Sequence, residues 1–292
     1  MKAYIFPGQG SQFIGMGHDL YKSHQQAKKL FLLANNILNF DICKVMFEGS
    51  LEELKTTNIT QPAIFIHSVI LAKCINNFSP NMVAGHSLGE FSALTAINTI
   101  TFEEGLKLVL ARANAMHEAC KNNNSTMAAI IGLDASIVND ICKENKGIIV
   151  PANYNSPQQI VISGEEKAIE ETCETLKKIG AKRAIKIPVA GAFHSPIMES
   201  AKDSLKKAIN EIDFQKPSCP IYQNVCADPV INPNNIKQNL IDQLTAPVKW
   251  YQTIQNMINH GANTFYEVGP GSVLIGLNKR ISSEIESIKV TT

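Results

Sequence analysis

The sequence predicts an α/β fold, in which a large hydrolase-like domain with a mostly parallel sheet carries an inserted, ferredoxin-like small domain. Three observations predict it. Short apolar segments alternate with segments of helical periodicity in the first half, which indicates parallel strands covered by helices on both faces. After residue 124, short elements follow in the order β-α-β-β-α-β. Hydrophobic residues make up 45% of the 292 residues and charged residues 18%, a balance that supports a sizeable core and excludes wholesale disorder.

The elements expected in the first half alternate between strands and helices. In order, they are a strand at 3–6, helices at 20–38 and 63–74, a strand at 82–85, and helices at 88–97 and 101–120. Thr101 and Glu104 form a capping box that opens the last of these helices.

A polar linker at 121–125 precedes the small domain. Its expected elements are a strand at 127–132, a helix at 136–143, strands at 147–152 and 159–163, a helix at 165–179 and a strand at 183–189. The predicted domains are therefore 1–123 with 191–292, and 124–190. After the return near Gly191, Ser195 and Pro196 open a helix, and a last strand at 264–268 leads into a C-terminal helix.

Charge and apolar patterning exclude several partners. Lys and Arg total 27 against 26 Asp and Glu, a net charge of +1, so we expect neither nucleic acid nor an anionic membrane as a partner. No apolar segment is long enough for a signal peptide or a membrane span. Seven cysteines lack both disulfide-like and metal-ligand spacing, which predicts reduced thiols, no metal site and a cytoplasmic location.

The segment from Gly85 to Gly89, with Ser87 at its centre, predicts a catalytic nucleophile. A short apolar strand precedes this G-x-S-x-G pattern and a helix follows it, which is the context of a nucleophile elbow. The turn leaves no room for side chains two residues either side of the serine. Ser87 then lies at the positive end of the following helix.

A serine hydroxyl needs a base within hydrogen-bond reach. Of the seven histidines, we predict His194, which lies where the chain re-enters the large domain. His86 abuts the serine, but its side chain should leave the elbow in another direction. Only Asp134 and Asp140 lie between Ser87 and His194, both inside the small domain, so an ordinary Ser-Asp-His triad is not expected.

Arg112 is the one charge in an otherwise uncharged, mostly apolar stretch of helix, 108–116. Its helix face predicts burial, and a buried guanidinium requires an anionic partner. That partner is either a structural carboxylate, such as Glu90 or Glu118, or a carboxylate on the substrate, held by two parallel hydrogen bonds.

The glycine-rich segment 6–12, Phe-Pro-Gly-Gln-Gly-Ser-Gln, follows the first strand directly. It has neither the Lys-Ser/Thr pair of a P-loop nor the spacing of a dinucleotide site. Its backbone N–H groups could instead stabilise an oxyanion, and a plain tight turn is the alternative.

Six motifs in order over nearly the whole chain resemble the malonyl-CoA:acyl carrier protein transacylase family of bacterial type II fatty-acid synthesis. They are segment 6–12, Gly-His-Ser-Leu-Gly-Glu at 85–90, Arg112, Gly-Ala-Phe-His-Ser at 191–195, Gln-Leu-x-x-Pro-Val-x-Trp at 243–250 and Tyr-Glu-Val-Gly-Pro-Gly at 266–271. One departure is Ala113, where the family usually has glycine.

The resemblance implies a role for each matching residue. Ser87 is acylated, and His194 is the base and acid. Backbone N–H groups of Gln9 and Leu88 form the oxyanion hole, Arg112 binds the malonyl carboxylate, and a main-chain carbonyl, that of Gln243, orients the histidine in place of a triad carboxylate. Ala-Phe-His at 192–194 is the form associated with malonyl rather than methylmalonyl units.

The function predicted is therefore ping-pong transfer of malonyl from malonyl-CoA to the phosphopantetheine thiol of holo acyl carrier protein. The resemblance implies a monomer. It also implies that no cofactor is needed, because both thiols belong to the substrates. A serine thioesterase or other hydrolase with the same elbow is the first alternative, and a non-enzymatic nucleotide-binding module is the second.

Overall fold

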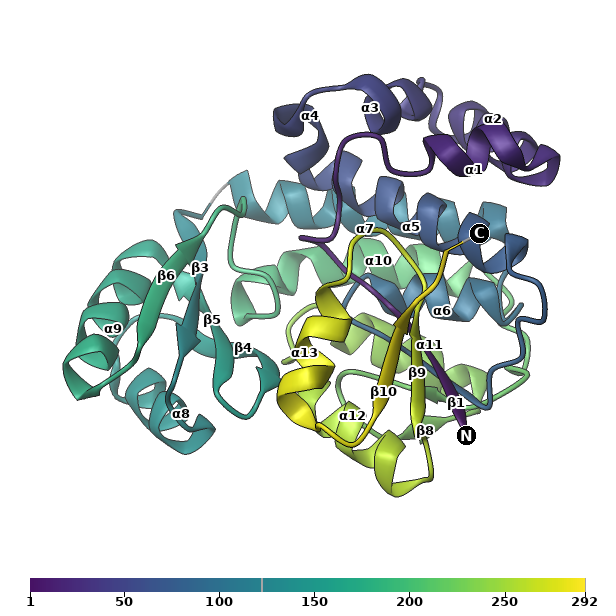
Figure 1. The fold of residues 1–292 in the computed structure, drawn as a ribbon. Coiled ribbons are helices and arrows are strands. Elements are labelled where there is room, and N and C mark those ends of the chain that lie inside the picture. The colour runs from purple at the N-terminus through teal and green to yellow at the C-terminus, as the bar shows by residue number, and fades with distance from the viewer. Residues whose placement is uncertain (122, 292) are drawn as a thin grey trace.

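The computed structural model describes residues 1–121 and 123–291. Asn122, in the predicted linker, and Thr292, in the predicted large domain, lie outside the described residues. Two separate sheets organise the chain (Figure 1): a six-stranded, mostly parallel sheet A and a four-stranded, antiparallel sheet B. The predicted fold class is thereby confirmed.

Sheet A brings two loops of the predicted site together. Its order is β10-β9-β1-β2-β7-β8, and every pair is parallel except β7 with β8. Phe6 at the end of β1 lies opposite Gly85 at the end of β2, so the loops carrying Gln9 and Ser87 leave the same edge of the sheet. The strands are β1 Lys2–Phe6, β2 Met82–Gly85, β7 Ile221–Tyr222, β8 Pro229–Val230, β9 Thr264–Glu267 and β10 Glu286–Lys289.

Helices cover both faces of sheet A (Figure 1). Side chains alternate along β1, since Tyr4 and Phe6 join one apolar core and Ala3 and Ile5 another. The first core includes α2 Gln25–Leu38, α5 Thr57–Cys74, α6 Gly89–Ala96, α7 Phe102–Lys121, α10 Glu199–Asn210 and α11 Pro233–Asp242. The second includes α12 Trp250–Asn259 and α13 Val273–Ile281.

Short helices near the N-terminus depart from the prediction. The helical stretch expected at 20–38 is divided into α1 (His18–Ser23) and α2 by the extended backbone of His24, and α3 (Ile42–Glu48) and α4 (Leu51–Lys55) follow without having been predicted. The helix expected at 63–74 begins earlier, at Thr57. Pro62 lies inside this helix. The helix is almost completely buried, and its packing against the core outweighs the local cost of the proline.

Sheet B has the predicted β-α-β-β-α-β order of elements. Its strands are β3 Ser125–Ile131, β4 Ile149–Ser156, β5 Gln159–Glu165 and β6 Arg183–Ile187, in the order β4-β5-β3-β6, and its helices are α8 Ala135–Glu144 and α9 Glu166–Ile179. Ile130, Ile160 and Ile162 pack in the apolar core formed with these helices. Met127 and Val161 belong instead to the first core of the rest of the chain. The elements lie within 124–190, and the division into two domains stays a prediction.

Two differences concern the second half. The prediction that 264–268 is the last strand is wrong, because β10 follows α13 and pairs with β9. It is a partly exposed edge strand without strong apolar alternation, so its periodicity gives little signal. The cap predicted at Ser195 is present: its hydroxyl accepts from the Ile197 N–H at 3.3 Å. It opens a 3₁₀ turn, η1 (Pro196–Met198), before α10.

Candidate active site

Ser87 lies at a sharp turn between β2 and α6. Its φ of 53° is in the left-handed region, which non-glycine residues seldom adopt. Gly85 and Gly89 flank the turn as expected: a side chain on Gly85 would collide with the backbone of Gly89, and one on Gly89 with the Phe6 carbonyl. The turn is therefore the predicted nucleophile elbow, with the serine at its apex.

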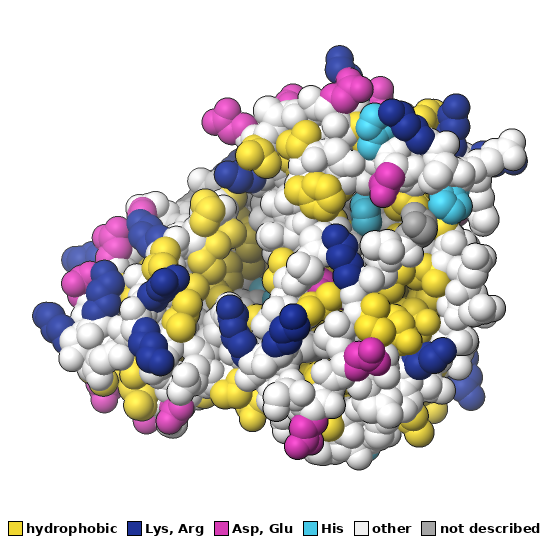
Figure 2. Space-filling view, viewed as in Figure 1, with side chains coloured by type: hydrophobic (Ala, Val, Ile, Leu, Met, Phe, Trp, Pro, Cys, Tyr) yellow, Lys and Arg dark blue, Asp and Glu magenta, His cyan; other side chains and the backbone are white. Residues whose placement is uncertain are grey.

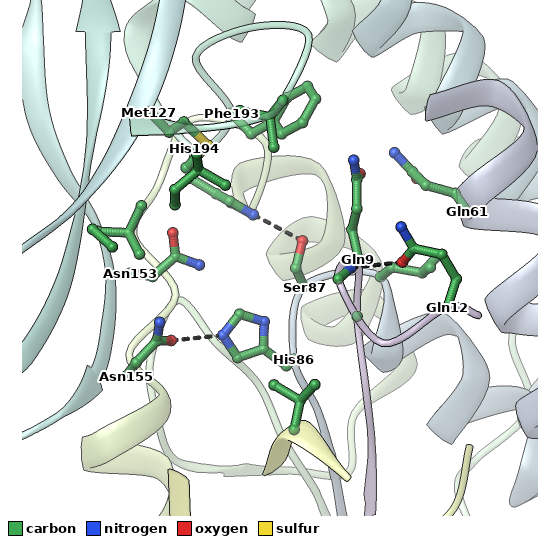
Figure 3. Close-up of a pocket in the computed structure, with 18 of the residues that line it drawn as sticks. Gln9, Gln12, Gln61, His86, Ser87, Met127, Asn153, Asn155, Phe193 and His194 are labelled. Carbon is green, nitrogen blue, oxygen red and sulfur yellow. Dashed lines mark hydrogen bonds between the residues drawn. The ribbon is translucent and has the colours of Figure 1, made fainter. Parts of the chain in front are cut away.

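His194 meets Ser87 from the loop that follows β6, 107 residues further along the chain. Its Nε2 lies 2.8 Å from the Ser87 Oγ (Figure 3). Its Nδ1 lies 2.8 Å from the backbone carbonyl oxygen of Gln243. An Nδ1–H donated to that carbonyl leaves Nε2 as an acceptor for the serine proton. The arrangement supplies a nucleophile, a base and a group that orients the base.

Arg112 is buried, 1% exposed, on α7. Its Nη2 donates to the Ser87 Oγ at 2.9 Å and to Gln243 Oε1 at 3.0 Å, and its Nη1 donates to Gln61 Oε1 at 2.7 Å. The Nε has no partner in the part of the chain that the structure describes. The guanidinium is thus held entirely by neutral groups, directly beside the Ser87 hydroxyl.

Neither proposed structural carboxylate pairs with Arg112. Glu118 is exposed and pairs with Lys121 at 2.6 Å. Glu90 is fully buried, and its carboxylate accepts hydrogen bonds from Gln223 and Asn224 instead. Within residues 1–121 and 123–291, no carboxylate lies within ion-pair distance of the guanidinium.

The backbone N–H groups of Gln9 and Leu88, near Ser87, have no acceptor among the described residues. Both residues line the same cavity as Ser87. The N–H of Ser87 itself is not available, because it donates to Asn224 Oδ1 at 2.7 Å. Free N–H groups beside a nucleophile can stabilise a developing oxyanion.

This geometry agrees with comparisons with known proteins. Residues 3–292 match the family described as "Acyl transferase domain". The malonyl CoA-acyl carrier protein transacylase of Staphylococcus aureus is 39% identical over 99% of this chain and 95% of its own length, and that of Bacillus subtilis is 40% identical over 99% and 93%.

The chain belongs to the malonyl CoA-acyl carrier protein transacylase family. Solved structures agree, since the transacylase of Coxiella burnetii matches with a TM-score of 0.97 at 37% identity, over 100% of this chain and 94% of that one. A malonyl-transacylase in complex with a type II polyketide acyl-carrier protein matches with a TM-score of 0.95 at 36% identity, over 99% and 95%. The protein is an acyltransferase.

The transacylase cavity has a volume of about 440 Å³ and extends from Ser87 toward sheet B and α13. Hydrophobic side chains line the hollow between sheet B and the rest of the molecule in Figure 2. They include Met127, Val161, Ile187 and Leu277. The cavity can therefore hold an apolar arm with its reactive end at Ser87.

Burial and charge set the protonation of the site. Burial, together with the nearby Arg112 cation, lowers the pKa of His194 from 6.5 to about 3, so the imidazole is neutral and able to accept a proton. Burial lowers the pKa of Arg112 to about 10, and the guanidinium remains charged at neutral pH. Burial raises the pKa of Glu90 to about 8.

Sequence analysis missed several polar side chains of the site. His86 does point away from Ser87, as expected, and its Nε2 lies 2.8 Å from Asn155 Oδ1 on β4 (Figure 3). Gln61 follows Thr57, Asn58 and Thr60 in the polar first part of α5, so it gives no signal of the kind that identified Arg112. Asn155 and Asn224 lie in polar segments that give no such signal.

No group of three or more potential metal ligands occurs within the described residues. None of the helices in residues 1–121 and 123–291 is both long and apolar enough to cross a membrane.

Proposed function

We propose that this protein transfers the malonyl group of malonyl-CoA to the phosphopantetheine thiol of holo acyl carrier protein, through a malonyl-Ser87 intermediate. The observation that carries the proposal is the convergence on one atom: the Ser87 Oγ contacts both the base His194, at 2.8 Å, and the cation Arg112, at 2.9 Å. The names of the S. aureus and B. subtilis relatives and the carrier-protein complex of a relative support the same donor and acceptor.

In the first half-reaction, His194 Nε2 takes the proton of Ser87 as Oγ attacks the thioester carbonyl. The oxyanion receives the N–H groups of Gln9 and Leu88. As the carbon–sulfur bond breaks, the imidazolium returns the proton to the CoA sulfur, which leaves as a thiol. The Gln243 carbonyl keeps the imidazole oriented and stabilises its charged form.

In the second half-reaction, the pantetheine thiol gives its proton to His194 and its sulfur attacks the malonyl-serine ester. The oxyanion collapses, the new thioester forms, and the Ser87 Oγ regains its proton. The enzyme ends unchanged, so the transfer is ping-pong.

Arg112 supplies the selection for a carboxylate on the acyl group. Its neutral acceptors, Gln61, Ser87 and Gln243, can be replaced by the malonyl carboxylate, which makes stronger, charge-assisted hydrogen bonds to a guanidinium. A hydrolase with the same elbow has no use for this cation, so the acyl transfer reaction accounts for more of the site.

We also infer a monomer that works in the cytoplasm without a cofactor. The seven free cysteines fit a reducing compartment. Each substrate brings its own thiol, so the transfer needs no further group.

Mixing the enzyme with malonyl-CoA, followed by intact-mass and peptide analysis, tests the proposal. We expect a stable malonyl adduct on Ser87 that disappears when holo carrier protein is added, with malonyl recovered on the carrier. Ser87→Ala should give no adduct while keeping the wild-type melting temperature. Rapid malonate release without carrier protein would identify a hydrolase, and full labelling of Ser87→Ala would exclude this nucleophile.

A further inference from the structure

The backbone of the nucleophile is in a conformation that its own side chain does not favour. Ser87 has a φ of 53°, and it is not a glycine. Such a conformation persists only where the surrounding structure holds it in place. The groups that bind the backbone of the elbow therefore decide where the Ser87 Oγ points.

One side chain binds the elbow on both sides of His86. The Oδ1 of Asn224 accepts the Ser87 N–H at 2.7 Å, and its Nδ2 donates to the Gly85 carbonyl at 2.7 Å. The Ser87 N–H has no other acceptor within the described residues, and Asn224 Oδ1 also accepts a longer hydrogen bond from Gln243 Nε2 at 3.5 Å. A carboxamide suits this pair because it offers one acceptor and one donor side by side.

Asn224 is itself firmly held. It is fully buried, and its backbone N–H donates to Glu90 Oε1 in the first turn of α6, directly after the elbow. The Lys249 N–H donates to its carbonyl at 3.1 Å. Glu90 of α6 thus holds Asn224 in place. Asn224 in turn holds the turn from which α6 starts.

The other side of Ser87 is bound by a second amide. Gln243 Nε2 donates to the Ser87 carbonyl at 3.0 Å, while the Gln243 backbone carbonyl orients His194. Asn224 and Gln243 therefore hold the two ends of the same residue, and Asn224 alone holds its N–H.

We propose that Asn224 is a positioning residue: its carboxamide holds Ser87 in the left-handed conformation that aims Oγ at His194, and it withholds the Ser87 N–H from the cavity. Consequently, the Ser87 N–H is not available to the oxyanion, whereas those of Gln9 and Leu88 are. This inference rests on the proposed function, because its test measures acylation of Ser87.

The donor and acceptor pattern gives a specific signature. Asn224→Leu keeps the approximate shape but makes neither hydrogen bond. Asn224→Asp, when ionised, accepts from Ser87 and cannot donate to Gly85. When protonated, its O–H can donate while its carbonyl oxygen accepts, so the asparagine pattern returns. Acidification should therefore rescue the aspartate variant and not the leucine variant.

The test is single-turnover acylation by malonyl-CoA for both variants, beside thermal melts. Because a displacement of about 1 Å costs roughly 10²-fold in rate, we expect the rate constant at saturating malonyl-CoA to fall about 10²-fold, with little change in the half-saturating concentration. The ratio of Asn224→Asp to wild type should rise as the pH is lowered. Taking the ratio cancels the titration of Arg112 and His194 that the two proteins share, whereas Glu90, which accepts from the Asn224 N–H, titrates together with a carboxylate at position 224.

Asn256 supplies the matched control. Its Nδ2 donates to the Ala227 carbonyl at 3.0 Å and to Asp228 Oδ1 at 3.3 Å. It thus braces the same loop without touching the elbow. Asn256→Leu and Asn256→Asp should acylate at the wild-type rate, with no pH-dependent rescue.

Amide hydrogen exchange in the wild-type protein tests the geometry without any variant that might fail to fold. The Ser87 amide should exchange at least about tenfold more slowly than that of Leu88, which has no acceptor. Equal exchange, or wild-type acylation in folded Asn224→Leu, overturns the proposal. If the wild-type protein is not acylated at all, the proposed function is refuted. The exchange experiment then still tests whether Asn224 holds the Ser87 N–H.

Discussion

The two sides of Ser87 differ in how completely their polar groups are paired. On the cavity side, the N–H groups of Gln9 and Leu88 have no acceptor within the described residues, and Arg112 contacts only neutral groups. On the buried side, Asn224 uses both ends of its carboxamide and its backbone N–H, and Glu90 accepts from two residues.

This difference indicates which groups are available to bind the substrate. Buried polar groups normally find partners inside the protein, and those that do not are candidates for a functional role. We propose that the free donors and the cation on the cavity side bind an oxyanion and a carboxylate of the substrate, whereas the groups on the buried side hold the turn. Changes on the cavity side should therefore alter chemistry with little effect on folding.

The largest effect short of removing the nucleophile is expected from His194→Ala. Loss of a general base costs about 10²–10⁴-fold, so acylation by malonyl-CoA should slow by that factor without a large loss of stability. Rapid-quench measurement of the acyl-enzyme gives the rate. His86→Ala is the control, because His86 bonds to Asn155 and not to Ser87. Greater damage from His86→Ala would mean that the base is misassigned.

The pH dependence of acylation should show the low pKa of the base. Because the pKa of His194 is lowered to about 3, the imidazole stays neutral as the pH falls through 6.5, and kcat/KM for malonyl-CoA should change little between about pH 5 and 7. Arg112→Gln removes the cation that contributes to this lowering, so its acid limb should move to higher pH. A wild-type limb near pH 6.5 would contradict this picture.

A smaller effect, on stability alone, is expected at His67, which lines a different cavity from that of Ser87. Burial lowers its pKa from 6.5 to about 4. The folded state therefore binds this proton less readily than the unfolded state, and stability is lost as the pH falls from 6.5 toward 4, up to about 3 kcal/mol. His67→Leu should flatten that loss in urea unfolding at several pH values, with normal acylation at pH 7. An unchanged acid dependence would remove His67 as its source.

The sequence predicts the local parts of the site well. The elbow around Ser87 and the capping box at Thr101 depend on residues within a few positions of one another, and both are present in the structure. The burial of Arg112 follows from helical periodicity. These features need no knowledge of how distant segments meet.

The unpredicted parts are long-range contacts. The Ser87 N–H bonds to Asn224, 137 positions away, and Arg112 bonds to Gln61, 51 positions away. No local pattern identifies such pairs. Spacing alone left Arg112 with Glu90 or Glu118 as structural partners, and only the structure shows that neither carboxylate is within ion-pair distance. Gln243 was reached through the family resemblance, and its role in orienting His194 remains a prediction that the observed contact supports.

We propose that Arg112 has no ionic partner in the free enzyme because its guanidinium binds a carboxylate on the acyl group. Acetyl-CoA would leave the buried guanidinium without a charged partner, which costs about 3–5 kcal/mol, or roughly 10²·²–10³·⁷-fold in rate if it is felt in the transition state. Wild type should strongly prefer malonyl-CoA. In Arg112→Ala, both the attraction and the penalty are gone, so malonyl transfer should fall steeply while acetyl transfer falls little or rises.

The most direct measurement is kcat/KM for malonyl-CoA and acetyl-CoA on wild type and Arg112→Ala, beside thermal melts of both proteins. The account predicts a collapse of the malonyl-to-acetyl ratio in a variant that still folds. An unchanged ratio in a well-folded Arg112→Ala protein would contradict the role of Arg112 as the carboxylate-binding group.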